Sequence, residues 1–356
     1  MPINRLYNIW FQRIEQRWSH LRVTQRRNLT NLIVGIYLSK SVALNAIALK
    51  IQSQAVQVSI QRRLSRTLGN SAIRVRDCYD PEIEPLLAEI SKNGVVRILV
   101  DGSKVGNNHQ LLMASVAYRR RSIPIVWTWV RSSRGHSSSR KQLALLSHLR
   151  KLLPDEAKVL LLGDSEFGAV DIIRQVEKWK WDYVLRQKSS HLIQLANGRW
   201  KAFGDFVQKT GESNWLGKGL LTQKHAYPVY LLAHWKKGED IPWLLTTNFH
   251  TRRETLRGYK VRMWIEEMFG DMKGHGFNLE KTRLRDFRKL SRLTFAVVLL
   301  YFWLIAFGSK IIKSGLRRLV DRNERRDLSI FQIGLRSIER RLTNQERIPV
   351  SFLIYL

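Results

Sequence analysis

Short runs of aliphatic residues, separated by polar turns, dominate the chain between residues 95 and 186. Their length and their content of Val, Ile, Leu and aromatic residues predict five strands, at 95–100, 111–118, 123–130, 159–162 and 183–186. Apolar residues at helical spacing occupy the later gaps and predict helices over about 139–152 and 169–179. The resulting β-β-β-α-β-α-β order predicts an α/β fold in which a mixed sheet is covered by flanking helices.

The pattern changes on both sides of this segment. Residues 188–249 alternate short strand-like runs (229–233 and 243–246) with glycines and basic residues, which predicts a β-rich insertion. Residues 1–76 and 281–347 carry apolar residues at helical spacings and predict two helical regions.

One apolar run is long enough to be compared with a membrane span. Thr294–Phe307 reads TFAVVLLYFWLIAF, 14 residues without a charge, and Arg292 and Lys310 lie on either side of it. A bilayer needs about 20 predominantly apolar residues, whereas runs of about 10–14 more often belong to a buried core helix. The length of the run therefore predicts a buried helix, and we expect no membrane partner.

The charge balance narrows the choice of partner. The chain has 356 residues, with 61 Lys and Arg against 29 Asp and Glu, a net charge of +32 and a pI near 10.8. Such an excess indicates a polyanionic partner, nucleic acid first, while a hydrophobic content of 44 % excludes a disordered basic tail. The single cysteine, Cys78, excludes a disulfide framework and a cysteine-ligated zinc module. Since no secretory signal pattern is present, we expect a cytoplasmic protein.

The steepest charge density lies in residues 1–76, which hold 13 Lys and Arg and one acid, Glu15, a net charge of +12. Within this region Ser53–Leu68 has the pattern of a basic helix that ends near Gly69. It fits the recognition helix of a helix-turn-helix element, and it fits equally a basic face turned to solvent. The pattern alone leaves both interpretations open.

Acids are scarce in this chain, so two acids that end strands stand out. Asp101 follows RILV, and Asp164 follows VLLLG. If the two strands are parallel neighbours, their carboxyl ends bring the carboxylates together at the edge where open α/β sheets bind ligands. Close carboxylates repel each other, and a divalent cation such as Mg²⁺ or Mn²⁺ relieves that repulsion. The alternative is a pair of turn-forming aspartates, each followed by a small residue.

The segment 254–276 has the pattern of one helix that ends near Gly274. The positions of its polar residues around the helix axis single out a third acid. With 3.6 residues per turn, four polar residues fall on one face about 60° wide. They are Tyr259, Arg262, Glu266 and Lys273. Glu267 points away from this stripe, so the phase favours Glu266 over its neighbour. The structural alternative is an exposed face with an i,i+4 ion pair between Arg262 and Glu266.

With these residues in view, the sequence resembles the insertion-sequence transposases of the DDE superfamily. The group concerned is insertion-sequence family four, which carries a Tyr-x2-Arg-x3-Glu-x6-Lys signature. The four residues of the polar stripe match this signature without a change in spacing. Asp101 in VDGS and Asp164 in GDSEFG match the first two acids, and residues 188–249 match the β-rich insertion before the third. The resemblance covers about residues 95–310, and residues 1–76 only in character.

The resemblance implies a ribonuclease-H-like catalytic core with nuclease and strand-transferase activity. Asp101, Asp164 and Glu266 would be its catalytic and metal-binding triad, holding two Mg²⁺ ions for which Mn²⁺ can substitute. Two ions about 3.5–4 Å apart can stabilise the attacking and leaving oxygens of an in-line phosphodiester displacement. Water would be the first nucleophile and the freed 3′-hydroxyl the next.

The resemblance also implies contacts with DNA. Tyr259, Arg262 and Lys273 are expected to contact backbone phosphate near the cleaved end. Trp243, which opens the strand PWLLTTN, is expected to stack on a base flipped out beside the cut, although one of 12 Trp can equally be a core residue. The partner would be double-stranded DNA, as terminal inverted repeats and as target, bound by a homodimer in the prokaryotic nucleoid.

These interpretations divide the chain into five predicted regions. They are a helical basic DNA-binding region (1–76), two parts of the catalytic core (77–187 and 251–310), the β-rich insertion (188–250) and a basic helical C-terminal region (311–356). Two other functions stay open. One is a sequence-specific DNA-binding regulator without catalysis, and the other is a related nuclease or an inactivated transposase copy.

Overall fold

The computed structural model describes residues 2–106, 109–131, 137–196, 198–322 and 324–355. The chain forms two compact units, each built from segments that are distant in the sequence. The first comprises Met1–Leu86, Lys104–His109 and Met268–Leu356, and the second comprises Leu87–Ser103 and Gln110–Glu267. The five functional regions inferred from the sequence stay predictions.

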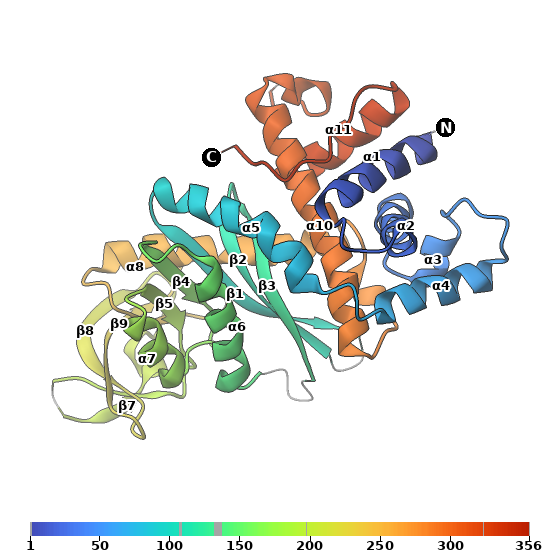
Figure 1. The fold of residues 1–356 in the computed structure, drawn as a ribbon. Helices are drawn as coiled ribbons and strands as arrows, with labels where there is room; N and C mark the ends of the chain where they lie inside the picture. The colour runs from blue at the N-terminus through green and yellow to red at the C-terminus, as the bar shows by residue number, and fades with distance from the viewer. Residues whose placement is uncertain (1, 107–108, 132–136, 197, 323, 356) are drawn as a thin grey trace. The chain divides into compact units, whose positions relative to one another are not determined.

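Helices make up the first unit (Figure 1). They are α1 (Pro2–Arg17), α2 (Val23–Ser39), α3 (Leu44–Ala48), α4 (Gln57–Gly69), most of α5 (Val75–Lys92), α10 (Phe287–Lys313), η4 (Leu316–Leu319) and α11 (Ile330–Thr343). The predicted helical regions at both ends of the chain are therefore confirmed. The predicted basic helix is α4, which begins four residues later than expected and ends at Gly69. α5 is absent from the sequence-based prediction because Pro81 and Pro85 lie inside it.

The apolar run of the sequence lies in α10, the longest helix of the first unit. Asp286 caps it, because its Oδ1 accepts a hydrogen bond of 2.8 Å from the Lys289 amide. α10 is long and apolar enough to cross a membrane, yet 89 % of its most apolar window is buried within the structure. Trp303 packs edge-on against Trp10 of α1 and Tyr37 of α2, with ring centroids 5.3 and 5.9 Å apart. The prediction of a buried helix is confirmed.

α10 and α11 approach each other closely at two glycines. A side chain at Gly308 would collide with the backbone carbonyl of Ile330, and one at Gly334 with that of Leu304. Because glycine has no Cβ, the two helix backbones can pack directly on each other at this point.

A ten-stranded sheet of order β3-β2-β1-β4-β5-β10-β9-β8-β6-β7 forms the basis of the second unit. The strands are β1 (Val96–Val105), β2 (His109–Tyr118), β3 (Arg121–Arg131), β4 (Val159–Gly163), β5 (Asp182–Arg186), β6 (Leu192–Gln194), β7 (Trp200–Ala202), β8 (Ser213–Leu221), β9 (Tyr227–His234) and β10 (Trp243–Thr247). A short helix, η1 (Phe203–Phe206), follows β7. The five strands predicted between residues 95 and 186 are confirmed in place, but β1 continues beyond Asp101, where the sequence pattern ends it.

The directions of the strands make the sheet mixed. β1 and β5 both pair with β4 in parallel, with Val100 opposite Gly163 and Gly163 opposite Leu185. β2 and β3 are joined by Arg119 and Arg120, whose φ angles of 45° and 63° form a tight two-residue hairpin turn. α6 (Ser139–Leu152) and α7 (Val170–Lys178) match the predicted helices. The fold class, a mixed sheet with flanking helices, is confirmed.

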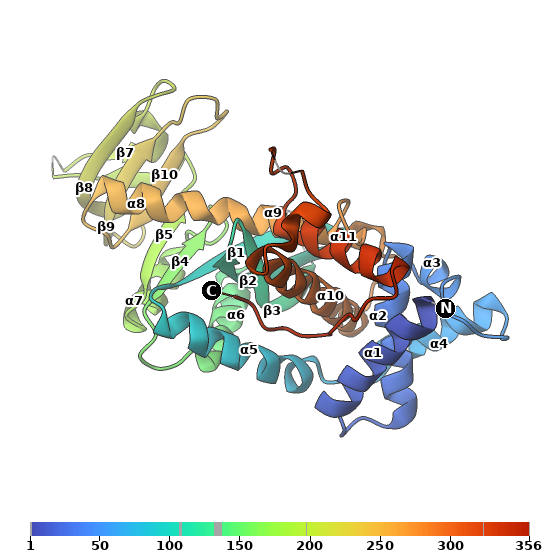
Figure 2. The ribbon, with the colours of Figure 1, turned by 90° about the horizontal axis from the view of Figure 1, so that it is seen from above.

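The β-rich insertion extends this sheet. β10 returns from the insertion and pairs antiparallel with β5, with Leu245 opposite Arg186. β9 pairs with β10 and β8 with β9, so the strands after β5 lengthen one edge of the sheet (Figure 2). The last strand of the insertion therefore leads directly into the segment with the third predicted acid.

That segment folds as three pieces, α8 (Arg252–Tyr259), η2 (Lys260–Met263) and α9 (Trp264–Met272). Thr251 begins α8, because its Oγ1 accepts a bond from the Glu254 amide and donates one to the Glu254 carboxylate. Gly258 lies against Leu160 and Leu162 of β4, so α8 covers the face of the sheet opposite α7 (Figure 2). The single helix predicted over 254–276 is wrong in two details. A 3₁₀ turn interrupts it, and it ends at Met272.

Candidate active site

Three charged residues fall in one row, in the middle of β1, directly after β4 and at the end of β5. The register that pairs Val100, Gly163 and Leu185 places Asp101, Asp164 and Arg186 in the next row. Asp101 is 8 % exposed. The two aspartates thus lie on parallel neighbouring strands, as their predicted meeting requires.

Arg262 of η2 connects this row to the third acid. Its Nη2 lies 3.3 Å from Oδ2 of Asp101, and its Nη1 donates a hydrogen bond of 2.7 Å to Oε1 of Glu266. The arginine side chain is 9 % exposed and that of Glu266 is 44 % exposed. The i,i+4 ion pair foreseen as a structural alternative is present, but the same arginine also reaches across to the sheet. Asp101 and Glu266 are therefore held together through one buried cation.

Burial and mutual repulsion set the charges of this cluster. Burial raises the pKa of Asp101 to about 7, Arg262 opposes the rise, and the nearby Asp164 adds to it. Burial also raises the pKa of Asp164, against the lowering effect of Arg262. For Arg262, burial acts to lower the pKa, but Asp101, Tyr259 and Glu266 outweigh it and the net shift is upward. The arginine stays charged, while the carboxylates lack full compensation.

Tyr259 and Trp243 form an aromatic pair beside the cluster. Their rings meet edge to face, with centroids 5.0 Å apart, and Trp243 is 6 % exposed. The Tyr259 hydroxyl is buried without a hydrogen-bond partner among the described residues. Burial raises the pKa of Tyr259 to about 12, Arg262 and Arg186 lower it, and the two aspartates raise it, so this hydroxyl lies within the field of the charged row.

Two further residues of the segment have partners outside the cluster's own contacts. Lys273 follows α9 and belongs to the first unit, where its Nζ donates a bond of 2.9 Å to the Lys104 carbonyl. Glu267 forms an ion pair of 3.1 Å with Arg121 on β3, and its side chain is 54 % exposed. Adjacent glutamates of α9 thus have different partners, as the helical phase predicts.

Known proteins can now be compared with this arrangement. A family model described as a transposase DDE domain matches residues 97–303, more than half of the chain. The chain belongs to the transposase DDE domain family. No curated protein matches the sequence. Among solved structures, the chain is similar to a piggyBac transposase in a synaptic complex with hairpin DNA, with 11 % identity, a TM-score of 0.42 and coverage of 97 % of this chain and 78 % of that one.

Transposase DDE domains generally use divalent metal ions, and the donor chemistry of this cluster fits such an ion. Asp101, Asp164 and Glu266 offer hard carboxylate oxygens, and the burial that raises the pKa of the two aspartates disfavours their charged forms unless a cation compensates them. In the part of the chain that the structure describes, no three His, Cys, Asp or Glu side chains form a group ready to hold a metal ion. Arg262 instead bridges two of the acids.

Two residues near this cluster are not indicated by the sequence pattern. Arg186 ends β5, and its place beside Asp164 depends on the strand register. Glu166, two residues after Asp164, accepts bonds from Nε2 of Gln110 at 2.8 Å and from the Ser137 amide at 2.6 Å. Glu166 thereby ties the turn after β4 to β2 and to the start of α6. Its position within GDSEFG was visible in the sequence, but its partners were not.

The pKa of Asp101 gives a prediction for the transposase at different pH values. Its ordinary value is about 3.9, and the folded value is about 7. Between these values the folded state keeps a proton that the unfolded state releases, so stability is fully present below about pH 4 and is lost as the pH rises through 7. In EDTA, Asp101→Asn is expected to equal the wild type in urea unfolding at pH 4 and to exceed it at pH 8, by up to about 4 kcal/mol.

A matched control for this measurement is Asp155→Asn. Asp155 is paired with Arg150 at the surface, and its side chain is 97 % exposed. This variant should follow the wild type at every pH. A constant difference between Asp101→Asn and the wild type from pH 4 to 8 would contradict the assignment of the pH dependence to Asp101.

Proposed function

We propose that the chain is a DNA transposase of insertion-sequence family four, which binds the terminal inverted repeats of its element, cleaves the ends and joins them to target DNA. The observation that carries this proposal is the connection of Asp101 to Glu266 by Arg262, beside Asp164 on the neighbouring strand. The buried pair within it joins Asp101 and Arg262, which are 161 residues apart in the sequence. Membership of the transposase DDE domain family supports it.

The chemistry follows from these residues. Asp101, Asp164 and Glu266 would hold two Mg²⁺ ions, or Mn²⁺ in their place, which supply positive charge to the attacking and leaving oxygens. In the first reaction the oxygen of water bonds to phosphorus, the bond to the 3′ oxygen breaks, and that oxygen takes up a proton. In the second, the freed 3′-hydroxyl attacks a phosphorus of the target and releases a target 3′-hydroxyl. No covalent enzyme intermediate is needed.

Other residues would position the DNA. Arg262 can grip a phosphate with two parallel hydrogen bonds once it leaves its carboxylates, and Lys273 supplies a point charge. The buried hydroxyl of Tyr259 is available as a donor. Residues 1–76, with a net charge of +12, would bind the ends of the element, and two copies would act together on nucleoid DNA.

A nicking assay on duplexes that carry the element's own ends tests this function. Wild-type protein should nick the end in Mg²⁺ or Mn²⁺ and be inactive in EDTA. A DNA-binding regulator would bind the same duplex and leave it intact in every buffer, which would refute the proposal. Titration with Mn²⁺ followed by electron paramagnetic resonance counts the ions directly. Two are expected for the wild type and fewer for Asp164→Asn.

Trp243 gives a separate prediction about the flipped base. Extruding a base costs a few kcal/mol, and stacking on an aromatic ring returns about 1–3 kcal/mol. Because Trp243 is buried against Tyr259, it would have to leave this contact to receive a base. Trp243→Ala should therefore accumulate nicked ends without double-strand breaks, and an abasic site beside the cut should partly bypass the defect. Loss of soluble protein, or equal slowing of the first nick, would instead identify Trp243 as a packing residue.

A further inference from the structure

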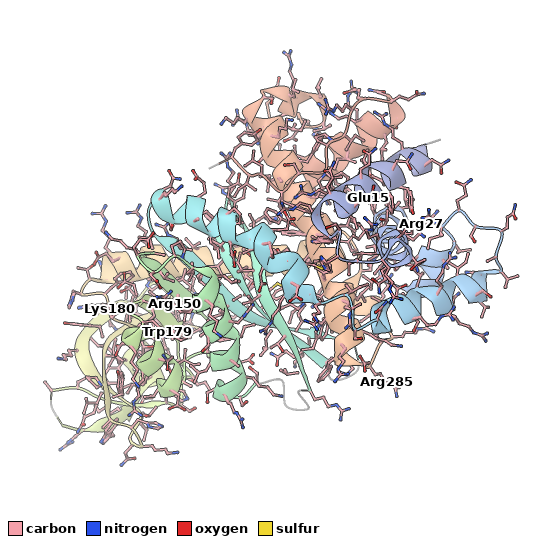
Figure 3. The ribbon with its side chains drawn as sticks, in the orientation of Figure 1. Glu15, Arg27, Arg150, Trp179, Lys180 and Arg285 are labelled. Atoms are coloured by element: carbon pink, nitrogen blue, oxygen red, sulfur yellow. The ribbon has the colours of Figure 1, made fainter. Side chains whose placement is uncertain are left out.

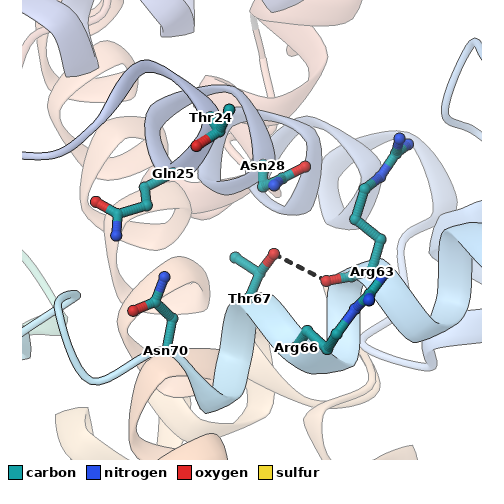
Figure 4. Close-up of a pocket in the computed structure, with 7 residues that line it drawn as sticks. All are labelled: Thr24, Gln25, Asn28, Arg63, Arg66, Thr67 and Asn70. Carbon is teal, nitrogen blue, oxygen red and sulfur yellow. Dashed lines mark hydrogen bonds between the residues drawn. The ribbon is translucent and has the colours of Figure 1, made fainter.

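A polar pocket lies between α2 and α4 in the first unit. It shares no residue with the proposed triad of acids. Its volume is about 320 Å³. The lining residues come from the first turns of α2 and from the second half and end of α4 (Figure 4): Thr24, Gln25, Asn28, Arg63, Arg66, Thr67 and Asn70. Every one of them is polar, and none is an acid.

The two arginines of the pocket have no acidic partner. Other arginines of the same unit are neutralised, since Arg13 and Arg17 pair with Glu82, and Arg26 pairs with Glu15. Within the described residues, neither Arg63 nor Arg66 forms an ion pair or donates a side-chain hydrogen bond. They lie three residues apart on one helix, so their charges repel each other. The pocket thus concentrates positive charge that the protein itself does not compensate.

Two of the neutral side chains of the pocket have used their amide oxygens as acceptors. The Gln25 Oε1 accepts a bond of 2.9 Å from the Arg22 amide, and the Asn70 Oδ1 accepts one of 3.0 Å from the Ala72 amide. Their NH₂ groups are left to face the pocket or solvent. The Thr67 hydroxyl donates to the Arg63 carbonyl, which fixes its orientation (Figure 4). Guanidinium and amide donors together form a receptor for an anion.

We propose that this pocket binds a backbone phosphate of duplex DNA. The inference rests on the proposed function and names a site for it. A base edge in the major groove offers donors as well as acceptors, whereas a phosphate offers acceptors only, and it matches the donor-rich lining. A phosphate held here fixes the position of α4 on the duplex without reading the sequence. Exposed residues at the start of α4, such as Gln57 and Val58, are then left for contacts with bases.

The test uses the full chain with both arginines replaced, Arg63→Gln and Arg66→Gln, and measures DNA affinity by fluorescence anisotropy as a function of salt. Loss of one phosphate contact should flatten the slope of log K against log salt by about 0.9 and weaken binding about tenfold at 0.1 M salt. The loss should be equal for end-containing and scrambled duplexes. Phosphate ethylation should show a position that weakens wild-type binding and has no effect on the variant.

Two further variants complete the experiment. Arg27→Gln removes one positive charge from α2 at an exposed position outside the pocket (Figure 3), and it should keep the wild-type interference pattern. Asn28→Asp replaces one amide by a carboxylate of the same size and so puts a negative charge into the pocket. It should weaken DNA binding at least as much as the double variant. Circular dichroism verifies that each variant is folded.

The outcomes separate this inference from the proposed function. If wild-type protein binds and nicks end DNA but all pocket variants keep its salt slope and interference pattern, the pocket assignment is wrong and the transposase proposal stands. A loss confined to one DNA sequence would show that the pocket contacts a base, which also overturns the phosphate assignment. If wild-type protein neither binds nor nicks DNA, both proposals fail together.

Discussion

Replacing any one of Asp101, Asp164 and Glu266 by its amide is expected to reduce the rate of strand cleavage by about 10²–10³-fold, the usual cost of removing one group from a charge-stabilising site. Each replacement keeps the size of the side chain and removes one negative charge. Affinity for end DNA should stay the same or rise, since DNA is itself an anion. Single-turnover cleavage and anisotropy on the same duplex measure the two quantities.

Glu267→Gln is the matched control for Glu266→Gln. The two glutamates are neighbours on α9, and the substitution is chemically identical. Glu267 pairs with Arg121 at the surface, while Glu266 is joined through Arg262 to Asp101. Glu267→Gln should therefore cleave at nearly the wild-type rate. Equal losses for the two variants would refute the assignment of the third acid, and full cleavage by Asp101→Asn would refute the whole triad.

Arg262→Met is expected to have the largest effect on stability. The change leaves Asp101 buried without its cation, and breaking a buried pair by removing one partner costs about 3–5 kcal/mol. Without Arg262, which lowers the pKa of Asp101, that carboxyl should hold its proton to a still higher pH. Urea unfolding in EDTA at pH 8 should show the loss, and the loss should shrink toward pH 5, where Asp101 is neutral.

A double-mutant cycle isolates the buried pair. Adding Asp101→Asn to Arg262→Met removes the uncompensated carboxylate, so the double variant should be more stable than Arg262→Met alone at pH 8. Arg74→Met, which breaks the exposed pair with Asp77, should cost at most about 1 kcal/mol. If Arg262→Met and its combination with Asp101→Asn unfold alike at pH 8, the ion pair does not stabilise the fold.

The sequence predicts the elements that have local signals. Val, Leu and Ile runs that end at Asp101 and Asp164 identify β1 and β4, whereas their parallel pairing, a condition in the sequence argument, is seen only in the structure. Helical phase predicts different surroundings for Glu266 and Glu267, and the structure pairs them with Arg262 and Arg121. These features depend on spacing within a few residues, and spacing is what a single sequence displays.

The features that the sequence does not predict depend on contacts between residues that are distant in the sequence. Nothing local indicates that β10 joins β5, so the insertion looks like a separate module although it continues the sheet. The position of Arg186 beside Asp164 depends on the strand register, and the contacts of Glu166 depend on residues 29 and 56 positions away. Pro81 and Pro85 make the sequence of α5 unlike that of a helix, although the folded helix contains both. Each of these features is decided by tertiary contacts.

The burial of α10 has a consequence for how the chain is made. Its partners α1, α2 and α4 leave the ribosome before it, so this apolar helix can be covered on one side as soon as it emerges. Its other side must wait for α11, whose Gly334 meets the backbone of α10 only after α11 has also been made. A chain released early, between α10 and α11, would therefore present an uncovered apolar stripe to chaperones and proteases.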